Sequence, residues 1–336
     1  MSLISDGFIR ALPKAELHLH IEGSLEPTQL LAFAERNKVE IPFKTVDEVQ
    51  KAYAFNNLQE FLDIYYQGMS VLQNEEDFYE LTKAYMKRVA QDGCVHAEIF
   101  FDPQGHTERG VAFEPVIEGI LRGLEDSEKE FGISSELILS FLRHLSEESA
   151  FETLHQATPY LDRILGVGLD SSELGHPPSK FEQVFKAARQ KGLKSFAHGG
   201  EEGPPDYVKE ALDLLDIDRL DHGNRSLEDD ELTARLVKEE MVLTVCPLSN
   251  LKLCVVDNLE QHPLKKMLDL GLKVTVNSDD PSYFGGYLAD NFRAVTDALM
   301  LTGEELKLLA RNSILGSYMD ENRKTKLLLQ IDGCVP

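Results

Sequence analysis

The chain is poor in the features that mark exported, membrane-bound and disulfide-stabilised proteins. Only four cysteines occur among 336 residues, and their spacing fits neither a disulfide framework nor a zinc-binding CxxC pair. The N-terminal stretch lacks the apolar core of a signal peptide, and no run approaches the roughly 18 apolar residues of a membrane span. We therefore expect a cytoplasmic protein with reduced cysteines that is neither exported nor inserted in a membrane.

Basic side chains are also scarce, with 34 lysines and arginines against 58 acidic residues and a formal charge of -24. An acidic surface is common among soluble proteins, but such a field also repels phosphate backbones and anionic membranes. Nucleic acid is therefore a poor candidate partner, whereas a neutral small molecule is compatible with this charge.

Low-complexity linkers and repeats of fixed period are absent, and eight short apolar runs alternate with longer amphipathic stretches. The expected strands are Ala15–Ile21, Val95–Phe101, Glu136–Leu142, Leu165–Leu169, Lys194–Ala197, Arg219–Asp221, Val242–Val245 and Lys273–Val276. The expected helices between them include Glu75–Gln91, Phe113–Phe131, Lys180–Lys191, Pro205–Leu215, Asp229–Glu240 and Pro263–Leu270. Eight such units predict a single (β/α)₈ TIM barrel over residues 1–336. A doubly wound open sheet is the alternative, and the absence of GxGxxG after the first strand disfavours it.

Two segments exceed what a plain barrel needs. The segment Thr28–Met69 is longer than one βα unit requires, so we expect extra helices covering the barrel mouth at about residues 28–69. The stretch LTGEELKLLARNS, near Thr302, predicts a capped amphipathic helix in the C-terminal tail.

A pair of histidines ends the first expected strand. Because strand side chains alternate between faces, His18 and His20 point the same way, while Leu17 and Leu19 point to the other side. Two imidazoles on one face can bind one metal ion, although a chance pair of histidines is the plain alternative for this motif alone.

Histidine or aspartate also follows three other expected strands, at His198, at His222 and at Asp279 with Asp280. The carboxyl ends of barrel strands are where catalytic residues gather. A lone histidine at a strand end is more often structural, but four strand ends with ligand-type residues are hard to explain by chance. Histidines with a carboxylate suit Zn²⁺, with iron or manganese as alternatives.

The expected strand ends also bear on the number of metal ions and on the paired aspartates. The stretch 170–173 (DSSE) offers no lysine whose carbamate could bridge two ions, which favours one metal ion. On a regular strand, Asp279 and Asp280 would face opposite sides, one toward the metal and one toward a substrate.

Four motifs in order, LPKAELHLHIEG, SFAHGGE, DHGN and NSDDP, resemble the adenosine/adenine deaminase family of the amidohydrolase superfamily over Leu12 to Pro281. The resemblance implies one zinc ion held by His18, His20, His198 and Asp279. It also implies that Glu201 protonates purine N1, that His222 orients and deprotonates the attacking water, and that Asp280 contacts N7. Protonating a ring nitrogen requires Glu201 to have a raised pKa, which a water-poor pocket would supply. The PCxxC signature of cytidine-type deaminases is absent.

Departures from the nucleoside enzymes favour a substrate without a sugar. Glu22 stands where similar adenosine deaminases carry aspartate against the ribose, and Ser172-Glu173 replaces a glycine near N3. The motifs HIEGSLEP and FDPQGHT also resemble the adenine deaminase subgroup. We therefore expect deamination of adenine to hypoxanthine and ammonia in purine salvage, with Glu22 and Glu173 in the substrate site. N6-substituted adenines and adenosine are the alternative substrates, and either carboxylate has a structural alternative.

Two residues of the FDPQGHT segment have an open role. Asp102 and His106 lie either on a substrate loop or in a structural Asp-Pro turn.

Two further hypotheses come from other classes. A metal-bound barrel could bind a purine without turnover, but such a module has no need of Glu201 and His222 as a matched acid and base. An amidohydrolase could instead cleave an ester or amide, but the position of Glu201 suits protonation of a ring nitrogen. A small purine base is thus the expected partner, and the number of subunits is left open.

Overall fold

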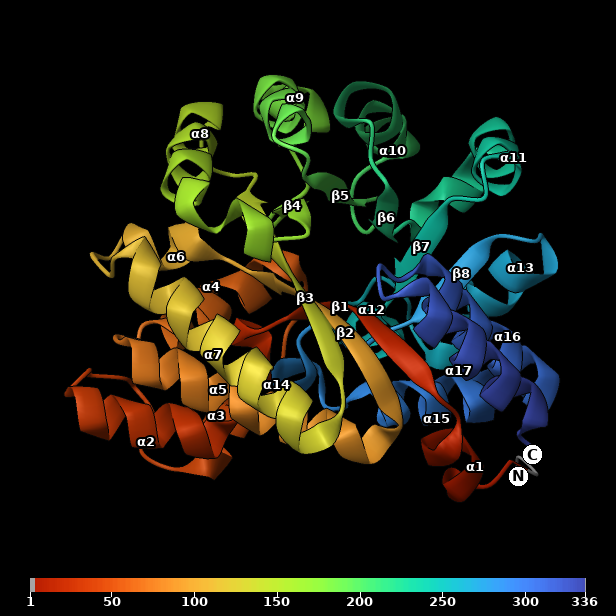
Figure 1. Cartoon of the computed structure of the whole chain (residues 1–336), viewed down its shortest axis with the longest axis horizontal. Helices are drawn as coiled ribbons and strands as arrows, with labels where there is room; N and C mark the ends of the chain where they lie inside the picture. The colour runs from red at the N-terminus through yellow and green to blue at the C-terminus, as the bar shows by residue number, and fades with distance from the viewer. Residues whose placement is uncertain (1–3, 336) are drawn as a thin grey trace.

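Eight parallel strands form a ring in this computed structural model, which describes residues 4–335 (Figure 1). The strands are β1 Lys14–His20, β2 Cys94–Phe101, β3 Ser134–Leu142, β4 Gly166–Asp170, β5 Lys194–Gly199, β6 Arg219–His222, β7 Val242–Val245 and β8 Lys273–Val276. They pair in sequence order, and β8 returns to β1 through a bridge between Leu19 and Asp279. The expected TIM barrel and all eight expected strands are confirmed, and the doubly wound sheet is excluded.

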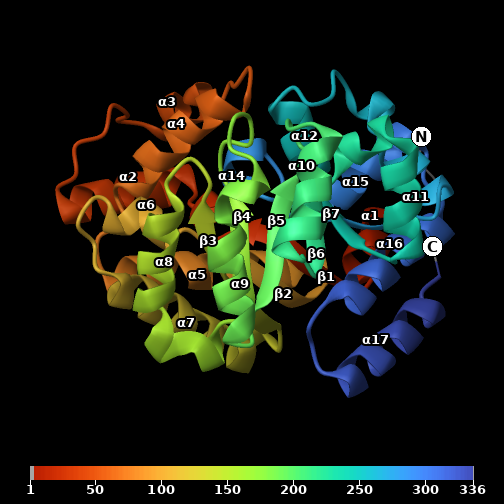
Figure 2. The same ribbon diagram turned by 90° about the horizontal axis from the view of Figure 1, so that it is seen from above.

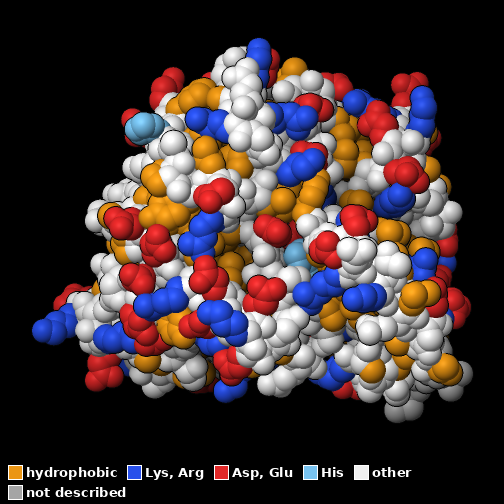
Figure 3. Space-filling view, in the orientation of Figure 1, with side chains coloured by type: hydrophobic (Ala, Val, Ile, Leu, Met, Phe, Trp, Pro, Cys, Tyr) orange, Lys and Arg blue, Asp and Glu red, His pale blue; other side chains and the backbone are white. Residues whose placement is uncertain are grey.

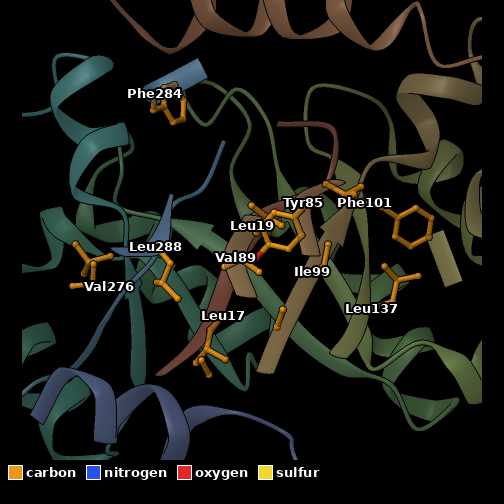
Figure 4. Close-up of a cluster of buried hydrophobic side chains, with 14 of the residues drawn as sticks. Leu17, Leu19, Tyr85, Val89, Ile99, Phe101, Leu137, Val276, Phe284 and Leu288 are labelled. Carbon is orange, nitrogen blue, oxygen red and sulfur yellow. The ribbon is translucent and has the colours of Figure 1, made fainter. Parts of the chain in front are cut away.

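The first strand shows why the histidines face the barrel interior. Leu17 and Leu19 point outward, and Leu19 lies beside Tyr85 and Val89 of helix α5 (Glu75–Val89) (Figure 4). All of these side chains are buried. Because side chains alternate along a strand, packing the leucines against the helical layer turns His18 and His20 inward.

An outer layer of helices covers the strands, as expected for a barrel (Figure 1). Its members are α5, α7 Phe113–Phe131, α8 Glu147–Gln156, α9 Glu182–Gln190, α10 Pro205–Glu210, α11 Asp230–Lys238, α13 Leu264–Asp269, α15 Leu288–Leu299 and α16 Gly303–Gly316. Helix α16 begins with the expected cap, since Thr302 Oγ1 accepts from the Glu305 backbone and the Glu305 carboxylate accepts from the Thr302 backbone. Helices α1 Asp6–Ala11 and α17 Glu321–Gly333 lie near the chain ends.

A second set of helices gathers at the carboxyl end of the barrel (Figure 2). These are α2 Pro27–Asn37, α3 Val46–Ala52, α4 Leu58–Met69, α6 Pro103–Thr107, α12 Pro247–Lys252 and α14 Pro281–Phe284. Helices α2 to α4 occupy the segment for which extra helices were expected. Helix α4 buries one side, including Leu58, Phe61 and Tyr65, and this side faces the end of the barrel where the predicted site lies.

Single helical turns complete the chain at Glu22–Ser24, Ala90–Asp92, Thr158–Arg163, Pro178–Phe181, Ala211–Leu215, Asn224–Glu228 and Leu259–Gln261. Across residues 4–335, no helix combines the length and the apolar character needed to cross a membrane. Acidic and basic side chains are interspersed on the face shown in Figure 3.

Candidate active site

The predicted metal ligands meet at the carboxyl end of the barrel, although they lie up to 261 positions apart in the chain (18 to 279). The Nε2 atom of His198 is 3.1 Å from Nε2 of His18 and 3.2 Å from Nε2 of His20. Oδ1 of Asp279 is 3.3 Å from His18 Nε2 and 3.6 Å from His20 Nε2. The structure therefore brings the four residues to one point.

The chemistry of these four groups fits a metal ion. In each of the three histidines, Nδ1 faces an oxygen that can accept a hydrogen bond from it. The pairs are His18 with Thr244 Oγ1 at 2.9 Å, His20 with Asp170 Oδ2 at 3.5 Å and His198 with Asp221 Oδ2 at 3.6 Å. With hydrogen on Nδ1, the three Nε2 lone pairs and a carboxylate oxygen face one another, which is repulsive unless a cation lies between them. Ligands about 2.0–2.1 Å from a tetrahedral ion lie about 3.3 Å apart, close to the observed separations.

His222 lies close to the same cluster. It forms a compact group with His18, His198 and Asp279, so the geometry offers a fifth candidate ligand. However, its Nε2 is 3.9 Å from Oδ2 of Asp279 and 3.6 Å from Oε2 of Glu201. His222 thus lies between the metal cluster and Glu201.

The backbone at Asp279 departs from the regular strand that the sequence suggested. Its φ of 63° is left-handed, so Asp279 and Asp280 both line the cavity instead of facing opposite sides. Glu16 holds the preceding residue, because its carboxylate accepts from the Ser278 backbone at 2.9 Å and from the Ser278 hydroxyl at 3.1 Å. This anchor fixes the turn from which both aspartates project.

Burial shifts the pKa values of the ionisable groups around the cluster. Burial raises the pKa of Glu201 well above its usual range, and the nearby Asp279 carboxylate adds to this rise. Burial also lowers the pKa of His222 to about 3. For Asp279, burial favours the neutral form, but the surrounding histidines outweigh it and lower its pKa. The site thus combines a carboxyl whose pKa is raised with an imidazole whose pKa is lowered.

A cavity that opens to solvent, with about 380 Å³ of empty space, adjoins these groups. His20, His198, His222, Glu201, Asp279 and Asp280 line its floor, and apolar side chains of α4, including Leu58, Phe61 and Leu62, cover its mouth. Phe284 and Leu253 complete this apolar cover. Such a lining limits water around the reacting groups.

Glu22, expected to contact the substrate, is not among the residues that line the cavity. Its Oε1 atom accepts from the Asp102 backbone at 3.1 Å and pairs with His106 Nε2 at 2.9 Å. The Glu22 side chain, which follows β1, thus binds the segment after β2 through Oε1, whereas its Oε2 has no hydrogen-bond partner among residues 4–335. His106 is therefore part of this support.

Glu173, which was also expected in the substrate site, is not among the residues that line the cavity. Its carboxylate accepts four backbone N–H bonds, at 2.7–3.1 Å, from the loop Gly200–Gly203 after β5. The physical reason is that a buried carboxylate needs donors, and this loop points its amides at Glu173. Glu173 thus positions the backbone that carries Glu201.

Other lining residues were not singled out from the sequence. Asp170, Ser171, Tyr65 and Tyr66 all face the cavity. Asp170 ends an apolar strand, as the histidines do, so the same sequence signal could have identified it. The tyrosines carry no such signal, because aromatic residues on a helix face are usually core residues.

Comparison with known proteins agrees with this geometry. A family model described as adenosine deaminase matches residues 13–334. The chain belongs to the adenosine deaminase family. A protein from Sphingopyxis alaskensis named adenine deaminase is 65% identical over 97% of this chain and 95% of its own length. Another adenine deaminase, from Caulobacter vibrioides, is 60% identical over 97% of this chain and 94% of its own length.

Solved structures of related deaminases and hydrolases share the fold. The crystal structure of adenine deaminase from Arthrobacter aurescens is 50% identical, covers 96% of this chain and 99% of its own, and has a TM-score of 0.95. An amidohydrolase from Burkholderia ambifaria with bound zinc is 28% identical, covers 99% of this chain and 94% of its own, and has a TM-score of 0.90.

Proposed function

We propose that this protein is a zinc-dependent hydrolase that converts adenine and water to hypoxanthine and ammonia in purine salvage. The observation that carries this proposal is that a cluster of metal-ligand side chains, a buried carboxyl, Glu201, and a buried imidazole, His222, meet at one cavity. The relatives named adenine deaminase support the choice of substrate.

In this proposal, His18, His20, His198 and Asp279 hold the zinc ion, because their donor atoms have tetrahedral spacing. His222 is left out of the ligand set, since its Nε2 is farther from Asp279 and adjoins Glu201. The relative with bound zinc supports this metal, and iron or manganese are the alternatives that such ligands accept.

The protein residues divide the reaction between them. Asp280 holds the purine at N7, and Glu201 gives its proton to N1 as the attacking oxygen bonds to C6. His222 orients the attacking water and removes its proton. The C6–N bond then breaks, and the amino group leaves as ammonia with the proton that His222 took from the water, while the remaining hydroxyl proton returns to Glu201. Zinc, when bound, supplies a Lewis acid that makes hydroxide available near neutral pH.

We also place the reaction in the cytoplasm. Cys94, Cys246, Cys254 and Cys334 are all free thiols, which suits a reducing compartment.

The test is a side-by-side assay of the purified, zinc-loaded protein on adenine, adenosine and N6-methyladenine. We expect kcat/KM to be highest for adenine, with release of ammonia in equal amount to hypoxanthine. A higher kcat/KM for adenosine would overturn the substrate assignment. Tight purine binding without turnover would instead identify a binding protein.

A further inference from the structure

A pair of buried carboxyls, Asp102 and Asp170, also lines the cavity. Asp102 follows β2 and Asp170 ends β4, and each side chain is almost fully buried. Both approach Nδ1 of His20, at 4.0 Å for Asp102 Oδ1 and 3.5 Å for Asp170 Oδ2. The phenol of Tyr65 donates to Asp102 Oδ2 at 3.0 Å.

These carboxyls have unused hydrogen-bonding capacity. Within residues 4–335, Asp102 Oδ1 and both oxygens of Asp170 have no hydrogen-bond partner. A buried acceptor without a donor costs about 1–3 kcal/mol, so such groups in a cavity point to a ligand that supplies the donor. Asp170 Oδ2 stands closer to His20 Nδ1 than Asp102 Oδ1 does, so Asp102 Oδ1 and Asp170 Oδ1 are the oxygens left without a neighbouring donor.

The order of strands around the barrel indicates which part of a purine Asp102 meets. In one direction the rim runs from β8 through β1, β2, β3 and β4 to β5. This step rests on the proposed function, in which Asp280 after β8 meets N7 and Glu201 after β5 meets N1. The purine perimeter between those atoms runs C8, N9, C4, N3 and C2. Asp102, after β2, then faces the N9 side of the ring.

We propose that Asp102 selects the free base by accepting a hydrogen bond from the N9–H group of adenine at Oδ1. A nucleoside carries carbon on N9, so it lacks this donor and directs its sugar against the carboxylate. Discrimination of this kind is strong, because the wrong ligand leaves a buried acceptor unpaired.

Glu22 is the positioning residue for Asp102 in this proposal. Its carboxylate binds the Asp102 backbone N–H at 3.1 Å and is itself fixed by His106. An aspartate at position 22 would be one methylene shorter and would not reach this N–H. The glutamate that distinguishes this chain from similar adenosine deaminases therefore acts on specificity through Asp102.

The first experiment measures the effect of changing Asp102 on two substrates, one with and one without the N9–H donor. The kcat/KM values of the wild type, Asp102→Ala and Asp102→Asn are measured on adenine and on 9-methyladenine, which lacks the donor. We expect Asp102→Ala to lower kcat/KM for adenine roughly 10- to 100-fold, mainly through KM, without lowering that for 9-methyladenine. The Asp102→Asn variant keeps a carbonyl acceptor and should recover most of the preference.

Asp77→Asn is the matched control. Asp77 is a buried carboxylate at the start of α5 that does not line the cavity, so its loss should leave the ratio of the two substrates unchanged. If Asp102→Ala lowers kcat/KM by the same factor for adenine and for 9-methyladenine, the ratio of the two values is unchanged. That result would show a purely structural role and overturn the proposal.

A binding experiment on the wild type keeps the proposal testable if the variants do not fold. Purine and 9-methylpurine lack the amino group, and their dissociation constants, measured by calorimetry, report binding without deamination. We expect purine to bind at least 10-fold more tightly, and equal binding would overturn the proposal. If the proposed function itself is wrong, the wild type will not deaminate adenine. The binding comparison does not depend on that activity, so the two failures can be distinguished.

Discussion

Replacing Glu201 by glutamine exchanges the acidic OH group of the side chain for an amide NH₂ group. The variant therefore lacks a proton that it can transfer, and little else changes. The side chain keeps its size, and its carboxyl lies outside the tetrahedral cluster, with His222 at 3.6 Å as its neighbour. Oε1 is buried without a hydrogen-bond partner among residues 4–335, so no folding interaction of that atom is lost. We therefore expect Glu201→Gln to fold and to retain its zinc.

The magnitude follows from the role of a general acid. Proton transfer in the transition state contributes about 10²–10⁴-fold, so the variant should lose about 3–5 kcal/mol of transition-state stabilisation. Because the pKa of Glu201 is raised, its protonated, active form persists to higher pH than that of a free glutamate and is lost as pH rises through that pKa. The wild type should thus lose kcat on the alkaline side, and Glu201→Gln should lack this dependence.

The assay is the change in ultraviolet absorbance as adenine becomes hypoxanthine, together with zinc content by elemental analysis. Glu202→Gln is the matched control, because Glu202 is the adjacent carboxylate and does not line the cavity. A Glu201→Gln enzyme that deaminates adenine at the normal rate would refute the role of this residue. A variant that loses zinc would show that Glu201 belongs to the metal site.

Three further changes test the supports of the site. Glu173→Gln should lower the free energy of unfolding by about 2–4 kcal/mol in denaturant titrations, because an amide group would face backbone donors that now bind a carboxylate. Asp221→Asn should weaken zinc binding about 10- to 100-fold in competition with a chelator, and unchanged affinity would show that the contact to His198 is incidental. Gly23→Ala should raise KM for adenine, since a Cβ there would overlap the Asp280 carboxyl. Gly7→Ala, where the nearest atom is 3.8 Å away, is its control and should leave KM unchanged.

The fold and the metal cluster were predictable because both depend on local periodicity. Apolar runs bounded by polar residues identify strands, and alternation along β1 places His18 and His20 on one face. Barrel closure then follows from the number of strands, and it brings their carboxyl ends together whatever the intervening sequence. His198 and Asp279 could therefore be assigned to the same point without knowledge of any contact between them.

Residues just beyond the strand ends could not be placed in this way. There the chain leaves the regular period, so the neighbour of a ligand can turn inward or outward. The left-handed backbone at Asp279 turns Asp280 into the cavity, whereas Glu22 and Glu173 turn away to bind backbone amides.

Both carboxylates nevertheless control groups that line the cavity. Glu22 anchors the backbone of Asp102, and Glu173 anchors the backbone of Glu201. A departure from a family pattern at such a position therefore alters specificity through the geometry of its neighbour, and variants of Glu22 should change the substrate ratio only while Asp102 is present.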